Sequence, residues 1–242
     1  GMKVSTRLLK PLRTTTIPFN KMGEAQAIRS LAQYTEKIRD RFRELAISYN
    51  INIITGSMPY IKADGGGLYN VGFLCRRNGM VDMYEKIHVT PDEEKYWGLS
   101  KGNHIQTFDT DCGRIGILIC YDVEFPELSR IMADEGMQIL FVPFMTDTQN
   151  AYNRVRLCAQ ARAIENECYV AIACHLRASV VVLHHVVVDD DAERASHNLV
   201  VGNDYHLPFR EDGNKLFYLL VSPKHVVVSV YAMKRTRKLV IV

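Results

Sequence analysis

Near the middle of the chain lies the stretch Ile115-Gly116-Ile117-Leu118-Ile119-Cys120-Tyr121-Asp122-Val123-Glu124-Phe125-Pro126-Glu127. Its first six residues form an unbroken apolar run, which predicts a strand covered on both faces. Pro126 is well placed in the first turn of a helix that we expect over residues 126–135. A buried strand that passes directly into a helix predicts a layered α/β fold.

The segments on either side of this stretch continue the alternation of helix and strand. A core-facing helix is predicted up to Tyr49, because its apolar residues recur at steps of three, four or seven. Asn78-Gly79 predicts a hairpin between strands 69–76 and 80–86. A second pair of strands is expected over 105–110 and 114–120, followed by strands at 138–142 and 168–173 and a helix at 150–165. These elements predict an α/β layered fold with a mixed sheet.

The composition excludes several classes of protein. The 242 residues are 47% hydrophobic and 24% charged, so the chain can bury a core and does not resemble a disordered protein. The net charge of +3 is too small to indicate a nucleic-acid or membrane partner. No apolar run is long enough for a membrane span, and no secretory signal is recognised. Six cysteines without a C-x-x-C pair indicate a reducing compartment, and we expect a cytoplasmic protein.

Three polar stretches follow predicted strands, at residues 84–94, 119–127 and 142–148. Ligand sites of open α/β sheets gather at the carboxyl ends of strands. Cys120 is the sharpest candidate for a nucleophile, since a strand-to-helix junction holds its side chain and aims backbone N–H groups nearby. The alternative is a buried cysteine that acts as a small apolar residue. Lys86 is either a partner of the thiol or a solvated lysine, and Glu93 and Glu94 are either functional carboxylates or the wet surface of a loop.

Taken together, three motifs resemble the nitrilase superfamily of carbon–nitrogen hydrolases. They are Glu85-Lys86-Ile87-His88, then Ile119-Cys120-Tyr121-Asp122-Val123-Glu124-Phe125-Pro126-Glu127, then Arg162-Ala163-Ile164-Glu165-Asn166. The similarity covers about residues 25–173. Residues 108–113 and 143–148 resemble the branch that is often fused to an acetyltransferase domain. The resemblance implies a four-layer α-β-β-α sandwich, incomplete at its N-terminus and atypical after residue 173.

The resemblance also implies a Glu-Lys-Cys triad that hydrolyses a small-molecule amide or, less readily, a nitrile. Cys120 matches the nucleophile, Lys86 the catalytic lysine, and Glu93 a second glutamate beside the triad. The thioester formed on the cysteine is then released by water. The substrate-facing residues implied are Tyr121, Glu124, Phe144 and Thr146. We expect no cofactor and no metal, and a homodimer or higher homo-oligomer. Arg162 and Glu165 are interpreted as a structural i,i+3 pair.

The first departure from the family pattern concerns the general base. The family places a glutamate after a proline at the end of an early strand, and no Pro-Glu precedes Lys86 here. Glu24 and Glu36 lie on or beside the predicted helix. We therefore expect an N-terminally shortened domain over residues 1–173. The alternative function is a catalytically inactive nitrilase-like protein that binds or assembles.

The second departure is residues 174–242, which hold fifteen of the twenty-three valines and six of the eight histidines. This segment is either a divergent end of the same domain or unrelated sequence, for instance from a shifted reading frame. Its histidines suggest a metal-binding module as a third alternative, but their spacings lack the fixed ligand pairs of zinc sites. The histidines concerned are His175, His184, His185, His197, His206 and His225, with Asp189, Asp190 and Asp191 beside the second and third.

Overall fold

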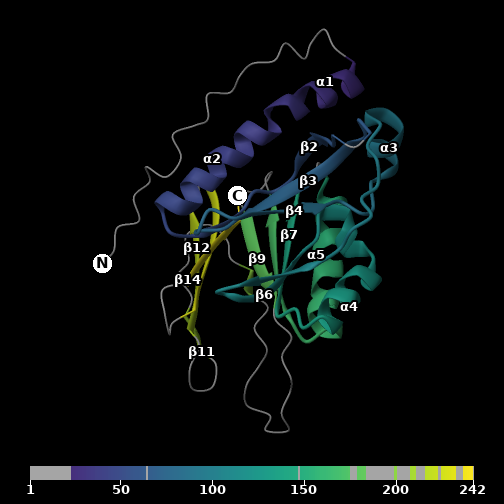
Figure 1. The fold of residues 1–242 in the computed structure, drawn as a ribbon. Coiled ribbons are helices and arrows are strands. Elements are labelled where there is room, and N and C mark those ends of the chain that lie inside the picture. Colours follow the sequence, from purple (N-terminus) through teal and green to yellow (C-terminus); the bar gives the residue numbers. More distant parts are fainter. Residues whose placement is uncertain are drawn as a thin grey trace.

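The protein has two sheets packed face to face between two layers of helices (Figure 1). A computed structural model describes residues 23–63, 65–146 and 148–174, together with the backbone of strands at 179–183, 199–200, 208–210, 216–222, 225–232 and 237–241. Helices α1 (Glu24–Leu31) and α2 (Thr35–Ser48) cover one sheet, and α4 (Pro126–Asp134) and α5 (Gln149–Glu165) cover the other. The expected four-layer α-β-β-α sandwich is confirmed.

The first sheet contains β1 (Asn52–Ile54), β2 (Met58–Ile61), β3 (Leu68–Cys75) and β4 (Val81–Glu85). Strand β3 pairs antiparallel with all three of the others. The second sheet contains β5 (Thr107–Thr110), β6 (Gly113–Ile117), β7 (Ile139–Phe144) and β8 (Tyr169–Cys174). Strands β6, β7 and β8 run parallel, whereas β5 pairs antiparallel with β6, so the sheet is mixed as predicted.

Alternation along each strand divides the apolar residues among three cores. On β7, Ile139 and Phe141 face the other sheet, while Leu140 and Val142 pack with the α4 and α5 layer. The core between the sheets also contains Ile54, Leu74, Phe108, Ile115, Ile117, Ala171 and Ala173. A third core joins α2 to the first sheet through Phe42, Ala46, Ile53, Val71 and Phe73. Four layers follow from these three interfaces.

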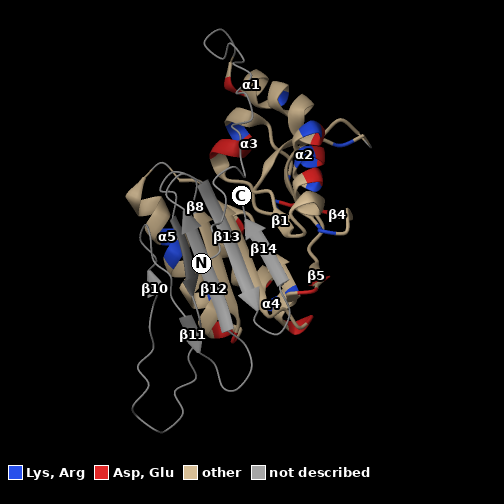
Figure 2. Ribbon diagram, turned by 90° about the vertical axis from the view of Figure 1, so that its left-hand side faces the viewer, with Lys and Arg blue, Asp and Glu red and all other residues tan. Residues whose placement is uncertain are grey.

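The long N-terminal helix predicted up to Tyr49 is present, but a 3-10 turn at Ala32–Tyr34 divides it into α1 and α2. Helix α2 carries charges of both signs (Figure 2), and Arg41 Nη1 lies 2.8 Å from Glu44 Oε2 in an exposed i,i+3 pair. The Asn-Gly hairpin is also confirmed, with Gly79 at φ 87°, a left-handed conformation that glycine adopts without strain.

Three details of the expected elements differ from the structure. Strand β2 was not predicted. Strand 114–120 ends at Ile117, because the backbone turns into a 3-10 helix, η3 (Cys120–Glu124). The polar loop expected after Lys86 is in part a helix, α3 (Pro91–Trp97). Thr90, Pro91 and Glu93 are the N-cap, N1 and N3 residues of this helix, so a capping box overrides the reading of this acidic stretch as a wet loop.

Six short strands of residues 174–242 extend the two sheets through backbone pairing. Strand β9 (Ser179–Leu183) pairs antiparallel with β8 and with β10 (Leu199–Val200). Strands β11 (Pro208–Arg210), β12 (Leu216–Ser222), β13 (His225–Ala232) and β14 (Arg237–Ile241) form an antiparallel series, and β14 lies parallel to β1. The domain boundary at residue 173 stays a prediction. The possible metal ligands of this tail lie outside the residues whose side chains are described.

In the described part of the chain, no helix combines the length and the apolar character that crossing a membrane requires.

Replacing Phe141 with alanine tests the core between the sheets. The Phe141 side chain is fully buried, so Phe141→Ala leaves a cavity there and should lower the free energy of unfolding by about 3–5 kcal/mol. Leu157, on α5, is 63% exposed, and the control Leu157→Ala should change the free energy of unfolding by less than about 0.5 kcal/mol. Urea unfolding followed by circular dichroism measures both. Equal effects of the two variants would contradict the assignment of this core.

Candidate active site

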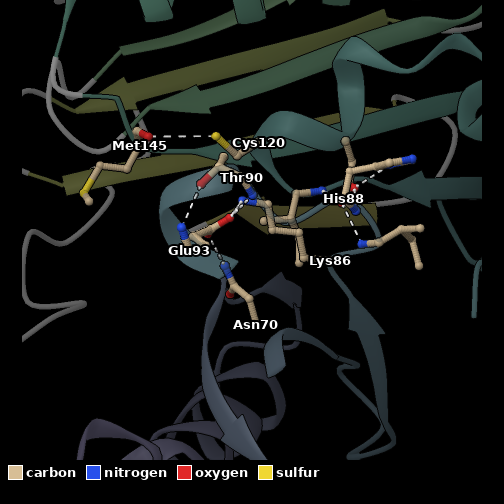
Figure 3. A network of polar contacts seen from close by, with 10 residues as sticks. Asn70, Lys86, His88, Thr90, Glu93, Cys120 and Met145 are labelled. Atoms are coloured by element: carbon tan, nitrogen blue, oxygen red, sulfur yellow. Dashed lines mark hydrogen bonds and ion pairs between the residues drawn. The ribbon is translucent and has the colours of Figure 1, made fainter. Parts of the chain in front are cut away.

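Cys120 begins the turn that follows β6, and its backbone is strained. Its φ of 50° lies in the left-handed region, which a non-glycine residue occupies only at a cost of about 1–2 kcal/mol. The side chain is partly exposed, and its Sγ donates to the carbonyl oxygen of Met145 at 3.9 Å (Figure 3). The turn therefore places the thiol at the end of a buried strand, where it is partly exposed and also packs against the two cores that border the second sheet.

Lys86 and Glu93 form a buried ion pair beside this turn (Figure 3). Lys86 directly follows β4, and its Nζ lies 2.5 Å from Glu93 Oε2. The two residues are 3% and 6% exposed, so both charges are removed from water. An isolated buried charge is strongly unfavourable, and each of these charges is compensated by the other.

The capping box of α3 explains why Glu93 lies inside the protein. Thr90 Oγ1 accepts the Glu93 N–H at 3.3 Å, and Glu93 Oε2 accepts the Thr90 N–H at 2.7 Å. Glu93 Oε1 accepts from Asn70 Nδ2 at 3.4 Å. The neighbouring Glu94 instead points to solvent and pairs with Lys101. The pattern Thr-x-x-Glu after a strand was the sequence signal that separates these two glutamates.

The surroundings of Cys120 act on its thiol in opposite directions. Burial raises the pKa of the Cys120 thiol above its ordinary value, and the negative charge of Glu93 adds to this. The positive charge of Lys86 opposes the rise in this pKa. Because Lys86 is already paired with Glu93, its field does not overcome the desolvation of the thiolate.

Asp122 is a fully buried carboxylate two residues after the cysteine. Its Oδ2 accepts the N–H of Ile119 at 3.2 Å and that of Ile87 at 3.4 Å. Its Oδ1 accepts the His88 N–H at 2.6 Å and lies 3.2 Å from His88 Nδ1. Burial raises the pKa of Asp122, while the His88 N–H and the charge of Lys86 lower it. Asp122 was not predicted from the sequence to be part of the site.

Arg162 supports the far end of the same turn. It is 5% exposed and donates from Nε to the Val123 carbonyl at 3.0 Å and from Nη2 to the Glu124 carbonyl at 3.4 Å. Its Nη1 lies 2.5 Å from Glu165 Oε2, which is the i,i+3 pair expected. Arg162 therefore has a structural role, as expected, and that role includes holding the turn that carries Cys120.

The four residues expected to face a substrate lie around the turn and the end of β7. Tyr121 packs edge-on against Phe125, with ring centroids 5.0 Å apart. Glu124 Oε1 accepts from Arg154 Nε at 2.7 Å. Phe144 is buried at the end of β7 with its ring 5.8 Å from Tyr152, and Thr146 follows as a half-buried residue. Their contacts with a substrate stay a prediction.

Neither N-terminal glutamate is directed at the thiol. Glu24 Oε2 accepts from Trp97 Nε1 at 3.2 Å, and Glu36 Oε1 accepts from the Tyr60 hydroxyl at 3.3 Å. Both lie on helices, as predicted. Among the residues with described side chains, no group of three or more His, Cys, Asp and Glu is arranged to hold a metal ion.

Two adjacent glutamates of α3 allow a matched test of the buried pair. Glu93→Gln leaves the Lys86 ammonium buried without its counter-charge, so the free energy of unfolding should fall by about 3–5 kcal/mol. Glu94→Gln removes an exposed ion pair on the same helix and should cost less than about 1 kcal/mol. Urea unfolding of both variants at neutral pH measures the difference. Similar small losses would show that the Lys86–Glu93 pair is not needed to compensate two buried charges.

Comparisons with known proteins indicate the family of the chain. The carbon–nitrogen hydrolase family matches residues 16–200. The probable hydrolase YhcX of Bacillus subtilis is 48% identical over 147 residues, which are 61% of this chain and 28% of that protein. The human omega-amidase NIT2 is 35% identical over 173 residues, or 64% of this chain and 61% of that protein. The chain thus spans less than two thirds of the length of these two relatives.

A solved structure adds a comparison of the fold. A variant of the amidase from Nesterenkonia sp. AN1 is 25% identical with a TM-score of 0.58, covering 67% of this chain and 64% of that chain. It shows covalent addition of the acetamide moiety of fluoroacetamide at the active-site cysteine. Because the family match covers more than half of the chain and the four-layer fold agrees with it, this protein belongs to the carbon–nitrogen hydrolase family.

Proposed function

We propose that the chain hydrolyses the carbon–nitrogen bond of a small-molecule amide through a thioester on Cys120. One observation carries this proposal. The partly exposed Cys120 sits in a strained turn beside a buried lysine whose charge acts on the thiol. A nucleophile with an adjacent cation is the arrangement that acyl transfer requires. The amidases among the relatives support an amide over a nitrile.

The reaction follows from the residue types. The Cys120 thiolate attacks the carbonyl carbon of the amide, and the carbonyl oxygen takes up the negative charge. Lys86 Nζ and the Tyr121 N–H stabilise this oxyanion. The C–N bond then breaks, the nitrogen takes up the proton that the Cys120 thiol gave up and leaves as ammonia or an amine, and a thioester remains. Water attacks the thioester, which releases the carboxylic acid and restores the thiol.

Glu93 is proposed to act by holding Lys86. Its Oε2 is occupied by Lys86 Nζ and the Thr90 N–H, and its Oε1 by Asn70. A carboxylate whose two oxygens have these partners holds the lysine side chain in place beside Cys120. The residues proposed to contact the substrate are Glu124, Phe144, Thr146 and, through its side chain, Tyr121. A homo-oligomer and the link to an acetyltransferase domain stay predictions.

The second candidate function is that of an inactive relative that binds or assembles. It is favoured by the partner of the thiol, because Cys120 Sγ donates to the Met145 carbonyl and not to a carboxylate among the described residues. A general base for the thiol or for water is therefore not assigned. The two functions differ in whether the chain turns over an amide.

Ammonia release from a panel of small amides and nitriles tests the proposal. The unmodified chain should release ammonia from at least one amide, and Cys120→Ala should abolish this release because the nucleophile is lost. Lys86→Met should lower kcat about a hundredfold or more, since one oxyanion donor is removed.

Cys158→Ala provides the control, because Cys158 is a half-buried cysteine on α5 outside the proposed machinery. It should retain the activity of the unmodified chain. Absence of release on every substrate from folded protein would support the inactive relative, and release that persists in Cys120→Ala would remove Cys120 as the nucleophile.

The pH dependence of Cys120 alkylation tests the environment of the thiol. Because burial raises the pKa of Cys120, the thiolate is scarce at neutral pH, and the alkylation rate should still be rising above about pH 8.5. Lys86→Met should move the profile to still higher pH, since it removes the attraction and leaves Glu93 negative. Mass spectrometry of the Cys120 peptide after iodoacetamide treatment measures the rate. A plateau reached below about pH 7 would contradict this assignment.

A further inference from the structure

We propose that Asp122 is a positioning residue that fixes Lys86 relative to Cys120. The proposal rests on the proposed function, in which these two side chains act on the same carbonyl group. Asp122 itself has no part in the chemical steps described above. Its contacts link the chain segment that carries the lysine to the turn that carries the cysteine.

A single oxygen atom makes this link. Asp122 Oδ2 accepts the N–H of Ile87, the residue after Lys86, and also the N–H of Ile119, the residue before Cys120. The other oxygen, Oδ1, accepts the His88 N–H at 2.6 Å and lies 3.2 Å from the ring nitrogen Nδ1 of His88. The carboxylate therefore holds two consecutive backbone N–H groups of the lysine segment and one of the cysteine turn.

The two segments belong to different sheets. Lys86 follows β4 of the first sheet, and Cys120 follows β6 of the second. The core between the sheets is apolar, and apolar contacts are not directional. Hydrogen bonds to a fixed carboxylate are directional, so Asp122 sets the position of one strand end against the other at the site.

The carboxylate also offsets the strain at Cys120. A left-handed residue persists only where its surroundings determine it, and Asp122 binds the Ile119 N–H on the preceding side of the cysteine. His88 covers the carboxylate with its ring stacked on Phe125, at 3.7 Å between centroids and 7° between planes. Figure 3 shows His88 beside Lys86, directed away from Glu93.

Asparagine cannot replace this carboxylate. The side-chain amide of the variant Asp122→Asn has one accepting oxygen, so its NH₂ group faces either the His88 backbone N–H or the N–H groups of Ile87 and Ile119. At least one backbone contact is therefore lost in either orientation. A shift of about 1 Å between Lys86 and Cys120 should lower kcat about tenfold to a hundredfold, with KM changed less than about threefold. Asp134→Asn, at an exposed position on α4, is the control and should leave both constants unchanged.

A double-mutant cycle on the thiol separates positioning from a general effect on the fold. In the unmodified chain, Lys86→Met should lower the alkylation rate of Cys120 at about pH 8 by about tenfold, because the nearby positive charge is lost. In the Asp122→Asn background, Lys86→Met should lower the logarithm of the alkylation rate by less than half as much, since the lysine is no longer held against the thiol. Alkylation of the Cys120 peptide is read by mass spectrometry, and circular dichroism verifies folding.

The readout does not require amidase activity, so it distinguishes failure of this proposal from failure of the proposed function. A full Lys86→Met effect in folded Asp122→Asn would overturn the positioning role. If Asp122→Asn does not fold, Asp122→Glu takes its place in the cycle, because it keeps a carboxylate but moves both oxygens away from the N–H groups of Ile87, His88 and Ile119. A reduced Lys86→Met effect in that background supports the proposal, and a full effect overturns it.

Discussion

The buried ion pair between Lys86 and Glu93 is the interaction on which the site depends. Burying two charges costs free energy that only close pairing and further hydrogen bonds offset, and here Thr90 and Asn70 supply those bonds. Because Glu93 is the N3 residue of α3, the same pair attaches that helix to the end of β4. The pair therefore sets the position of a positive charge beside Cys120 and the shape of the polypeptide around it.

The second constraint is the strained backbone at Cys120, which neighbouring side chains must keep from relaxing. The left-handed conformation of Cys120 starts the turn at the end of the buried strand and leaves the cysteine partly exposed. Asp122 binds the turn from its N-terminal side and Arg162 binds its last carbonyls. Both side chains are buried and charged, although neither takes part in the proposed chemistry. The strain is thus held by groups whose own burial depends on the turn.

The layered architecture explains how these groups meet. Period-two alternation on β7 separates the core between the sheets from the core under α4 and α5, so both faces of the second sheet are covered. The core under α2 covers the outer face of the first sheet. Lys86 and Cys120 each lie just beyond the carboxyl end of a strand, one on each sheet. The packed sheets bring these ends together, which is why residues far apart in the sequence act on one thiol.

Local patterns in the chain were sufficient to predict the family motifs, the α/β layers and the candidate residues Cys120 and Lys86, because periodicity and motifs are properties of neighbouring residues. They also contained the Thr90–Glu93 capping box, although an acidic loop was the interpretation made. The three-dimensional arrangement was needed to establish that Glu93 is buried and Glu94 is not, and that Asp122 joins two segments. The reason is physical: burial, ion pairing and hydrogen bonds between sheets depend on distances through space, which no local pattern encodes.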